Sequence, residues 1–218
     1  MQDFLFRLAL MRLHHVGVDL VALGADVRQK FARFAEVVKL ADPTFIGFEG
    51  AGGALFVAAL PHFIEVRYAR ETTFEEGVSE AVNHFATVYE IVSGNQGIFR
   101  PADGSAGVVI RFFAHRKLDD ALLATLLSRV LPPTISTVDV TGARLRLQWS
   151  VPSDVRREFD VGTDPRDKTQ LQVALRAERP LGLPTDAFVE WIRAEAAELR
   201  EQTVKTAIPL TTDVAAAV

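Results

Sequence analysis

Hydrophobic and polar residues alternate over residues 108–115, a pattern that predicts a β-strand with one strongly buried face. Helical spacing follows at once, and Asp119 or Asp120 stands where an N-cap is expected. Pro132 and Pro133 forbid continuation, so this helix is expected to end before them. The apolar stripe of the helix consists of Leu122, Leu123, Leu126, Leu127 and Val130.

The N-terminal part of the chain changes between strand and helix patterns. Residues 4–13 fit either an amphipathic helix or a strand, and periodicity does not decide between the two. Strand alternation continues over residues 12–20, and helical spacing then runs from Val27 to the Asp42-Pro43 stop. An antiparallel meander is indicated next by three extended segments, residues 44–49, 54–60 and 63–69.

A longer helix is expected over residues 73–92. Thr73 and Glu76 have the spacing of a capping box, in which the two side chains satisfy backbone amides at the start of a helix. Gly94 stands where a helix often ends on a left-handed residue. The glycine-rich stretch of residues 94–107 then suggests a boundary between two parts of the chain.

The C-terminal part of the chain repeats this order of elements. Residues 135–151 are expected to form a hairpin, and residues 156–161 are expected to pair with residues 170–177 across a polar turn. A last helix begins near Pro184 and precedes a frayed tail. The chain therefore ends, like its first part, on a helix that follows a set of strands.

Each part has the order strand, helix, two or three strands, helix, which is the basis for a structural pseudo-repeat. This order is similar to that of a split β-α-β, ferredoxin-like unit. We therefore expect an α+β protein with two similar halves, whose antiparallel sheets are each covered by helices on one face. The expected parts are residues 1–94, a connecting loop at 95–107, and residues 108–218, and the two halves may be packed as one compact unit.

The composition narrows the class of protein. Of the 218 residues, 49% are hydrophobic, which is enough for a substantial core. The formal net charge of −4 argues against a dedicated nucleic-acid-binding protein, because such proteins usually have a basic surplus. The chain has no cysteine, which excludes disulfides and a thiolate nucleophile and fits a cytoplasmic location.

The sequence gives no sign of a membrane segment. Its start is apolar but is interrupted by Arg7 and Arg12, so no signal sequence is expected there. The longest apolar run, residues 51–61, is shorter than the roughly 20 residues that a spanning helix needs. We therefore expect a soluble protein without membrane contact.

Three sequence patterns suggest ligand binding but are better explained as ordinary turns or as one side of a helix. Gly50–Gly53 resembles a phosphate-binding loop, but a strand follows it instead of a helix, so a hairpin turn is expected. The acidic turn Asp160–Asp167 lacks the spacing and the closing glutamate of an EF-hand. Glu76, Glu80 and His84 share one side of a helix, yet no second set of metal ligands accompanies them. We expect no cofactor and no metal.

No two residues in one segment have the spacing that general acid–base catalysis needs. His15 and Asp19 share a strand face, but about 13 Å along the strand separates them, which is too far for a hydrogen bond. Glu65, from another strand, is the remaining candidate partner for His14 or His15. No catalytic set is therefore expected.

His115, Arg116 and Lys117 form a basic cluster at the expected turn between strand and helix. Ligands often bind at the carboxyl ends of strands, and a helix N-terminus adds positive potential there. The alternative explanation is that Asp119 and Asp120 neutralise the cluster locally.

A set of arginines and glutamines shares one face of the expected C-terminal sheet. Leucines alternate with Arg144, Arg146 and Gln148, so leucines that face the helices leave the polar residues on the opposite face. Residues 1–107 carry 9 basic and 13 acidic residues, whereas residues 108–218 carry 15 of each. The face lacks the exposed aromatic residues that stack bases on RNA-binding sheets. Its other expected members are Arg111, Gln170, Gln172 and Arg176.

The leading hypothesis is a non-catalytic protein-interaction or regulatory module that self-associates, with a partner protein or a second copy on the polar sheet face. The alternative is an anionic-ligand or phosphoryl-substrate binding protein, or an enzyme, that uses the guanidinium groups of this face. Nucleic-acid binding through the same face is a third hypothesis. The candidate binding residues are Arg111, His115, Arg116, Arg144, Arg146, Gln148 and Arg176.

Overall fold

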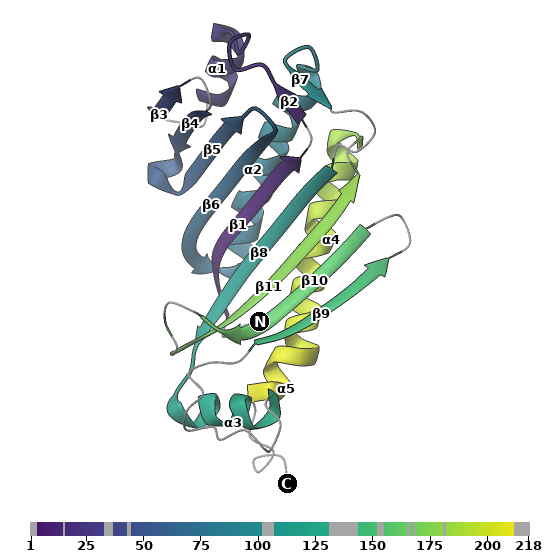
Figure 1. Ribbon diagram of the computed structural model, residues 1–218. Helices are drawn as coiled ribbons and strands as arrows, with labels where there is room; N and C mark the ends of the chain where they lie inside the picture. The colour runs from purple at the N-terminus through teal and green to yellow at the C-terminus, as the bar shows by residue number, and fades with distance from the viewer. Residues whose placement is uncertain are drawn as a thin grey trace.

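The computed structural model is an α+β protein in which one broad sheet carries its two long helices on one side (Figure 1). The structure describes residues 4–14, 16–32, 37–42, 45–101, 107–130, 144–151, 155–164, 167, 169–180 and 182–211.

The N-terminal half of the chain supplies six described strands and two α-helices. The strands are β1 (Leu5–His14), β2 (Val16–Val18), β3 (Val37–Asp42), β4 (Phe45–Gly50), β5 (Leu55–Leu60) and β6 (Phe63–Thr73). The helices are α1 (Ala25–Ala32) and α2 (Phe74–Gly94), and a 3-10 turn, η1 (Ala51–Gly53), joins β4 to β5.

The C-terminal half begins after a short strand, β7 (Phe99–Pro101). Its further described strands are β8 (Gly107–Lys117), β9 (Arg144–Val151), β10 (Val155–Thr163) and β11 (Gln170–Pro180). Its helices are α3 (Asp120–Val130), α4 (Thr185–Gln202), the π-helical turn η3 (Thr203–Ala207) and α5 (Ile208–Thr211).

Nine of the described strands form one antiparallel sheet in the order β3-β4-β5-β6-β1-β8-β11-β10-β9. β1 lies in the middle of this sheet and hydrogen-bonds to β6 on one side and to β8 on the other. β2 and β7 form a separate two-stranded sheet. The two halves of the chain therefore lie side by side in one sheet, and neither half covers the other.

This sheet corrects the predicted architecture. The sequence predicts a separate sheet for each half, but β1 pairs with strands of both halves. The ferredoxin-like order is not confirmed, because four strands lie between α1 and α2 and three described strands lie between α3 and α4. Helices cover only part of the large sheet (Figure 1). A repeat relation between the halves stays a prediction.

Two segments differ from the sequence-based assignment. The ambiguous residues 4–13 form β1, and the strand pattern predicted to continue beyond them breaks into the separate strand β2. Helical spacing predicts one helix from Val27 to Asp42, but α1 ends at Ala32 and β3 follows it. The backbone of β3 pairs with β4, and this tertiary pairing overrides a helical pattern that contains two adjacent valines.

Only the N-terminal end of α2 agrees with the prediction. Thr73 caps the helix, because its hydroxyl accepts a hydrogen bond from the backbone N–H of Glu76 at 3.3 Å. The predicted left-handed Gly94 is wrong: the helix continues through Gly94 and is closed by Asn95, which has a φ of −126°.

The C-terminal strands follow the prediction where they are described. β10 and β11 pair along their length, as the sequence predicts for residues 156–161 and 170–177. Of the predicted hairpin over residues 135–151, residues 144–151 form β9, which pairs with β10, and the rest lies outside the described residues.

The two long helices pack on the same side of the sheet in different ways. α2 lies close to β1 because Gly77 has no side chain: a Cβ there would come within 2.2 Å of the Cγ atom of Phe6. α4 is bound to β10 through Arg157, whose Nε and Nη2 atoms donate to Glu195 at 2.7 and 2.9 Å. The Glu195 side chain is 1% exposed, so this ion pair is part of the core.

None of the described helices is both long and apolar enough to cross a membrane.

Candidate functional site

Alternate side chains of the sheet point away from α2 and α4, and we call this surface the open face. Figure 1 views it from the front, with the two helices behind the sheet. Residues that are directly paired across strands share a face, so the pairing of Arg111 with Arg176 places both on it. The polar members from the C-terminal strands are Arg111, His115, Lys117, Arg144, Arg146, Gln148, Arg156, Glu158, Asp160, Gln170, Gln172, Arg176 and Glu178.

Six of the seven predicted binding residues lie on this face, and Arg116 does not. Arg116 lies on the helix side, with its guanidinium 5.4 Å from the ring centroid of Phe4. The turn predicted at this point is wrong, because β8 continues through Lys117 and neighbouring side chains of a strand point to opposite faces. The helix cap is Asp119, which accepts a hydrogen bond from the N–H of Leu122 at 2.8 Å.

Asp160 is the centre of a charge network on the C-terminal half of the open face. Its side chain is 6% exposed and accepts hydrogen bonds from Arg111 at 3.2 Å and from Arg146 at 2.9 Å. Arg146 also lies 3.5 Å from Glu158, which accepts a hydrogen bond from Gln148 at 2.6 Å. The hydrogen bond that Arg146 donates to Asp160 and the two carboxylate charges raise the pKa of Arg146.

The other two predicted arginines also contact groups of the same face. Arg176 donates to Glu178 at 2.8 Å, and Arg144 makes a long contact of 3.5 Å with the amide oxygen of Gln172. Arg111, Arg146 and Arg176 are therefore paired with carboxylates of the same face, whereas Arg144 contacts a neutral amide.

A second charge cluster lies on the N-terminal half of the open face. Glu65 of β6 is almost fully buried and accepts hydrogen bonds from Arg12 of β1 and from Arg67. The guanidinium of Arg12 also lies over the ring of Phe63, 5.4 Å from its centroid. Both halves thus repeat one arrangement, a buried carboxylate under two partly exposed arginines.

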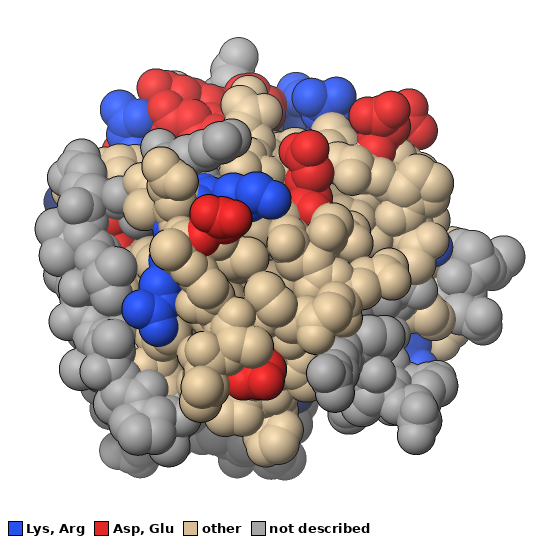
Figure 2. Space-filling model, turned by 90° about the horizontal axis from the view of Figure 1, so that it is seen from above, with Lys and Arg blue, Asp and Glu red and all other residues tan. Residues whose placement is uncertain are grey.

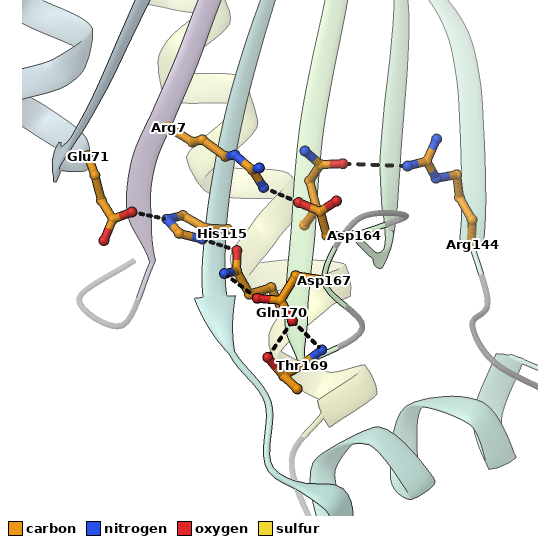
Figure 3. Close-up of polar contacts among 9 residues, drawn as sticks. Arg7, Glu71, His115, Arg144, Asp164, Asp167, Thr169 and Gln170 are labelled. Carbon is orange, nitrogen blue, oxygen red and sulfur yellow. Dashed lines mark hydrogen bonds and ion pairs between the residues drawn. The ribbon is translucent and has the colours of Figure 1, made fainter.

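His115 of β8 lies between the two halves, with Glu71 of β6 on one side and Gln170 of β11 on the other (Figure 3). The amide nitrogen of Gln170 donates to Asp167 at 2.8 Å, so its amide oxygen faces His115 Nδ1, 2.6 Å away. Nδ1 must therefore carry the proton. Nε2 then presents its lone pair when the ring is neutral, and it lies 3.7 Å from a carboxylate oxygen of Glu71.

Two further contacts complete this polar cluster. Arg7 of β1 forms an ion pair with Asp164, which follows β10 (Figure 3). Asp167 accepts hydrogen bonds from the hydroxyl and the backbone N–H of Thr169 at 2.6 and 3.0 Å, and these bonds lower its pKa. The cluster therefore links strands from both halves of the sheet across the open face.

The geometry of this cluster does not suit acid–base catalysis. A general base must reach a substrate proton, directly or through one water molecule. His115 Nε2 is buried and makes no hydrogen bond. Within the described ranges, no three histidine, aspartate or glutamate side chains are grouped so as to hold a metal ion.

Two shallow hollows lie at opposite ends of the sheet. One, of about 350 Å³, is lined by polar residues that include Gln148, Arg156 and Arg176. The other, of about 620 Å³, lies between the η1 turn and α2 and includes Glu80 and His84.

The predicted metal candidates on α2 do not converge in the second hollow. Glu80 accepts hydrogen bonds from the hydroxyl of Tyr68 and from Arg70, the latter at 2.7 and 2.9 Å. The ring of His84 packs 5.2 Å from that of Tyr68, and burial lowers the pKa of His84 although the charge of Glu80 opposes the shift. Glu76 instead accepts from the hydroxyl of the preceding Thr72.

The remaining sequence candidates have structural roles or lie outside the described part. The carboxylate of Asp19 accepts hydrogen bonds from two backbone amides of the following turn, at 3.0 and 2.9 Å. His15 is not among the described residues, so its predicted pairing with Glu65 is untested. Residues 50–53 turn the chain from β4 to β5, as predicted.

Sequence reasoning missed the carboxylates of the open face. Glu158 and Asp160 alternate with buried residues of β10, and this alternation places them beside the predicted arginines. The signal was present in the sequence as a strand with acidic residues at every second position. These carboxylates form ion pairs with arginines of the open face, so the arginines are not all free.

The end of the molecule that carries α1, β2 and β7 differs from the open face. Seen from this end, the centre of the surface shows few charged side chains (Figure 2). Val21, in the turn before α1, is 95% exposed. The centre of this end is therefore less densely charged than the open face.

The chain matches no protein-family model, and no curated protein shows significant sequence similarity to it. The residues of the open face are therefore the basis for the proposed function.

Proposed function

We propose that the protein is a non-catalytic protein-interaction module that self-associates, and that its open face meets a protein partner. One observation carries the proposal: most of the arginines of this face are paired with carboxylates of the same face. A surface of this kind presents paired guanidinium edges, hydrogen-bonding groups and apolar carbon together. Specific, non-obligate protein interfaces have this mixed character.

The arrangement of the sheet supports the need for a partner. An uncovered sheet face is explained either by the two halves packing on one another or by a partner. The halves lie side by side in one sheet, so within the described residues they do not cover each other. Within the described residues the open face is therefore accessible to a partner.

Apolar side chains among the charges add to this support. Phe113 lies beneath the guanidinium of Arg111, whose central carbon is 4.9 Å from the ring centroid. Leu8 and Leu10 of β1 are only partly buried beside it. Arginine over an aromatic ring gives a planar, weakly hydrated surface that a partner desolvates at low cost.

Sedimentation velocity over a wide range of protein concentration tests the self-association. We expect a shift from monomer to dimer as the concentration rises, at physiological salt. A monomer at every concentration would overturn the self-association.

The hollow near Gln148, Arg156 and Arg176 favours a second candidate, the binding of an anionic ligand. Calorimetric titration with inorganic pyrophosphate tests it. Binding that is lost in Arg176→Gln would support this function, because a planar guanidinium fork is then replaced by a neutral amide. No heat of binding for the wild type would exclude pyrophosphate as the ligand.

The internal pairing of the arginines disfavours nucleic-acid binding. We expect no change in the fluorescence anisotropy of labelled single- or double-stranded oligonucleotides at physiological salt. Salt-dependent binding would contradict this expectation, because it indicates release of counterions by free cationic groups. In that case Arg144→Glu with Arg146→Glu should abolish the binding, and the exposed helix pair Arg193→Glu with Arg200→Glu is the matched control.

A further inference from the structure

The strand β9 forms one border of the large sheet. It pairs with β10 on one side and has no neighbour on its other side within the described residues (Figure 1). An edge strand of this kind presents unpaired backbone N–H and C=O groups along its outer side. Such a border is a place where another strand can add to the sheet by backbone hydrogen bonds.

The side of β9 that faces the helices is apolar but is not covered by a helix. α4 packs on β11 and β8, and no described helix has a substantial contact with β9. Leu147 is 38% exposed, and Leu145 and Trp149 are only partly buried. Leu145 and Trp149 pack against the core at one side. The part of this apolar row that is still exposed gains free energy if a second strand covers its flank.

The charges of β9 decide which strand can pair with it. Arg144 and Arg146 both lie on the open face of the strand. In an antiparallel pair of two copies, registers centred on residues 144, 145 or 146 set arginine directly opposite arginine, which is unfavourable. Registers centred on Leu147 or Gln148 avoid this contact, and the one centred on Leu147 sets Arg146 opposite Gln148 and Arg144 opposite Ser150.

The same register matches the apolar side of the strand. Leu147 then lies opposite Leu147 of the second copy, and Leu145 lies opposite Trp149. Leu145, Leu147 and Trp149 each meet an apolar residue, and both arginines meet a polar neutral one. The strand is thus self-complementary in both charge and hydrophobicity, which is the requirement for a two-fold symmetric contact.

We infer that β9 is the self-association element, and that two copies join antiparallel at their β9 strands in the register centred on Leu147. This inference rests on the proposed function, because it assigns a surface to the self-association. The two-fold axis runs perpendicular to the sheet, so the open faces of the two copies point the same way. The dimer thereby presents one continuous face to a partner.

Cross-linking through a single introduced cysteine tests the register. The natural chain has no cysteine, so any disulfide dimer of a variant must join the introduced residues. Leu147→Cys places the two thiols directly opposite one another, and we expect it to form a disulfide dimer under mild oxidation. Ser150→Cys is the matched control, because the two copies of residue 150 lie far apart in this register, and it should remain monomeric on a non-reducing gel.

A charge exchange at the same position tests the symmetry of the contact. Leu147→Lys and Leu147→Asp should each weaken the dimer by roughly tenfold or more, because like charges then face each other across the axis. An equimolar mixture of the two variants should associate again, since lysine then faces aspartate. Val204→Lys changes another half-exposed apolar residue, 48% exposed, and should leave the dimer intact.

The outcomes separate this inference from the proposed function. A wild-type chain that stays monomeric would overturn both. A wild-type dimer that persists in Leu147→Lys, with no cross-link in Leu147→Cys, would overturn the β9 contact and keep the self-association. If that dimer is then lost in Arg111→Glu with Arg176→Glu, the two copies meet through their open faces instead. Circular dichroism of each variant verifies that the sheet is intact.

Discussion

The two halves of the sheet are held to their helices by opposite means. Under α2 the contact depends on a missing side chain, because Gly77 lets the helix approach the ring of Phe6. Under α4 the contact includes a buried ion pair, in which Arg157 spans the space between strand and helix to reach Glu195. Close apolar packing therefore anchors one half, whereas a long charged side chain bridges the other.

This difference has a consequence for how far each helix covers its strands. α2 contacts β1 and β6 closely, whereas α4 contacts β11 and β8 and leaves the border strand β9 without a helix. The C-terminal half has a partly exposed border and a face of paired charges, which is where we place the interactions with other molecules.

A larger side chain at Gly77 should have the largest effect on this difference between the two halves. Gly77→Ala puts a Cβ within 2.2 Å of Phe6, so α2 must move away from β1. We expect a loss of about 3 kcal/mol in the free energy of unfolding, measured by chemical denaturation. Gly94→Ala, on the same helix with no atom within 4 Å of its new Cβ, should leave stability unchanged or slightly higher. Equal effects of the two substitutions would contradict the close contact.

Loss of the buried carboxylate under α4 should have a smaller effect. Glu195→Gln removes the principal charge partner of Arg157, while Glu198 still lies 3.1 Å from the same guanidinium. Because one carboxylate remains, we expect a loss of about 2 kcal/mol in the free energy of unfolding. Glu201→Gln, in the exposed pair with Lys205, is the control and should leave it unchanged. A control that destabilises as much as Glu195→Gln would show that burial of the pair does not matter.

The smallest expected effect is a pH dependence in the N-terminal half. Burial beside Tyr68 lowers the pKa of His84 below its ordinary value of 6.5. As the pH falls below about 6.5, the unfolded chain therefore takes up a proton that the folded chain does not, and stability decreases. His84→Gln should reduce the loss of stability between roughly pH 7.5 and 5.5. His62→Gln, at an exposed turn, controls for the removal of one histidine; an equal reduction there would refute the role of His84.

Local chemistry in the sequence was enough to predict several elements. Alternation along residues 144–148 predicted that the arginines and Gln148 share a face, and the pairing of β9 with β10 agrees. The cap at Thr73 was predicted from its spacing to Glu76. Such features depend on neighbours in the chain, and the sequence records those neighbours directly.

Features that depend on distant partners were not predicted. The sequence of β3 has a helical pattern, and only its pairing with β4 makes this segment a strand. β1 joins both halves because it pairs with β6 on one side and with β8 on the other. The sequence of residues 5–14 does not indicate that this strand has two partners. For the candidate site, the arginines were predicted, but their neutralisation by Asp160 requires the register of β10 against β9 and its place beside β11.

The central place of β1 also bears on how the chain is made. β1 leaves the ribosome early, but β8, one of its two neighbours, is completed about 100 residues later. At a synthesis rate of about 5–20 residues per second, this delay is roughly 5–20 s. During that time β6 is made, but one edge of the apolar strand β1 still lacks its β8 neighbour. Arg7 and Arg12 interrupt its apolar run, and their charges oppose the stacking of nascent chains until translation has delivered both neighbours.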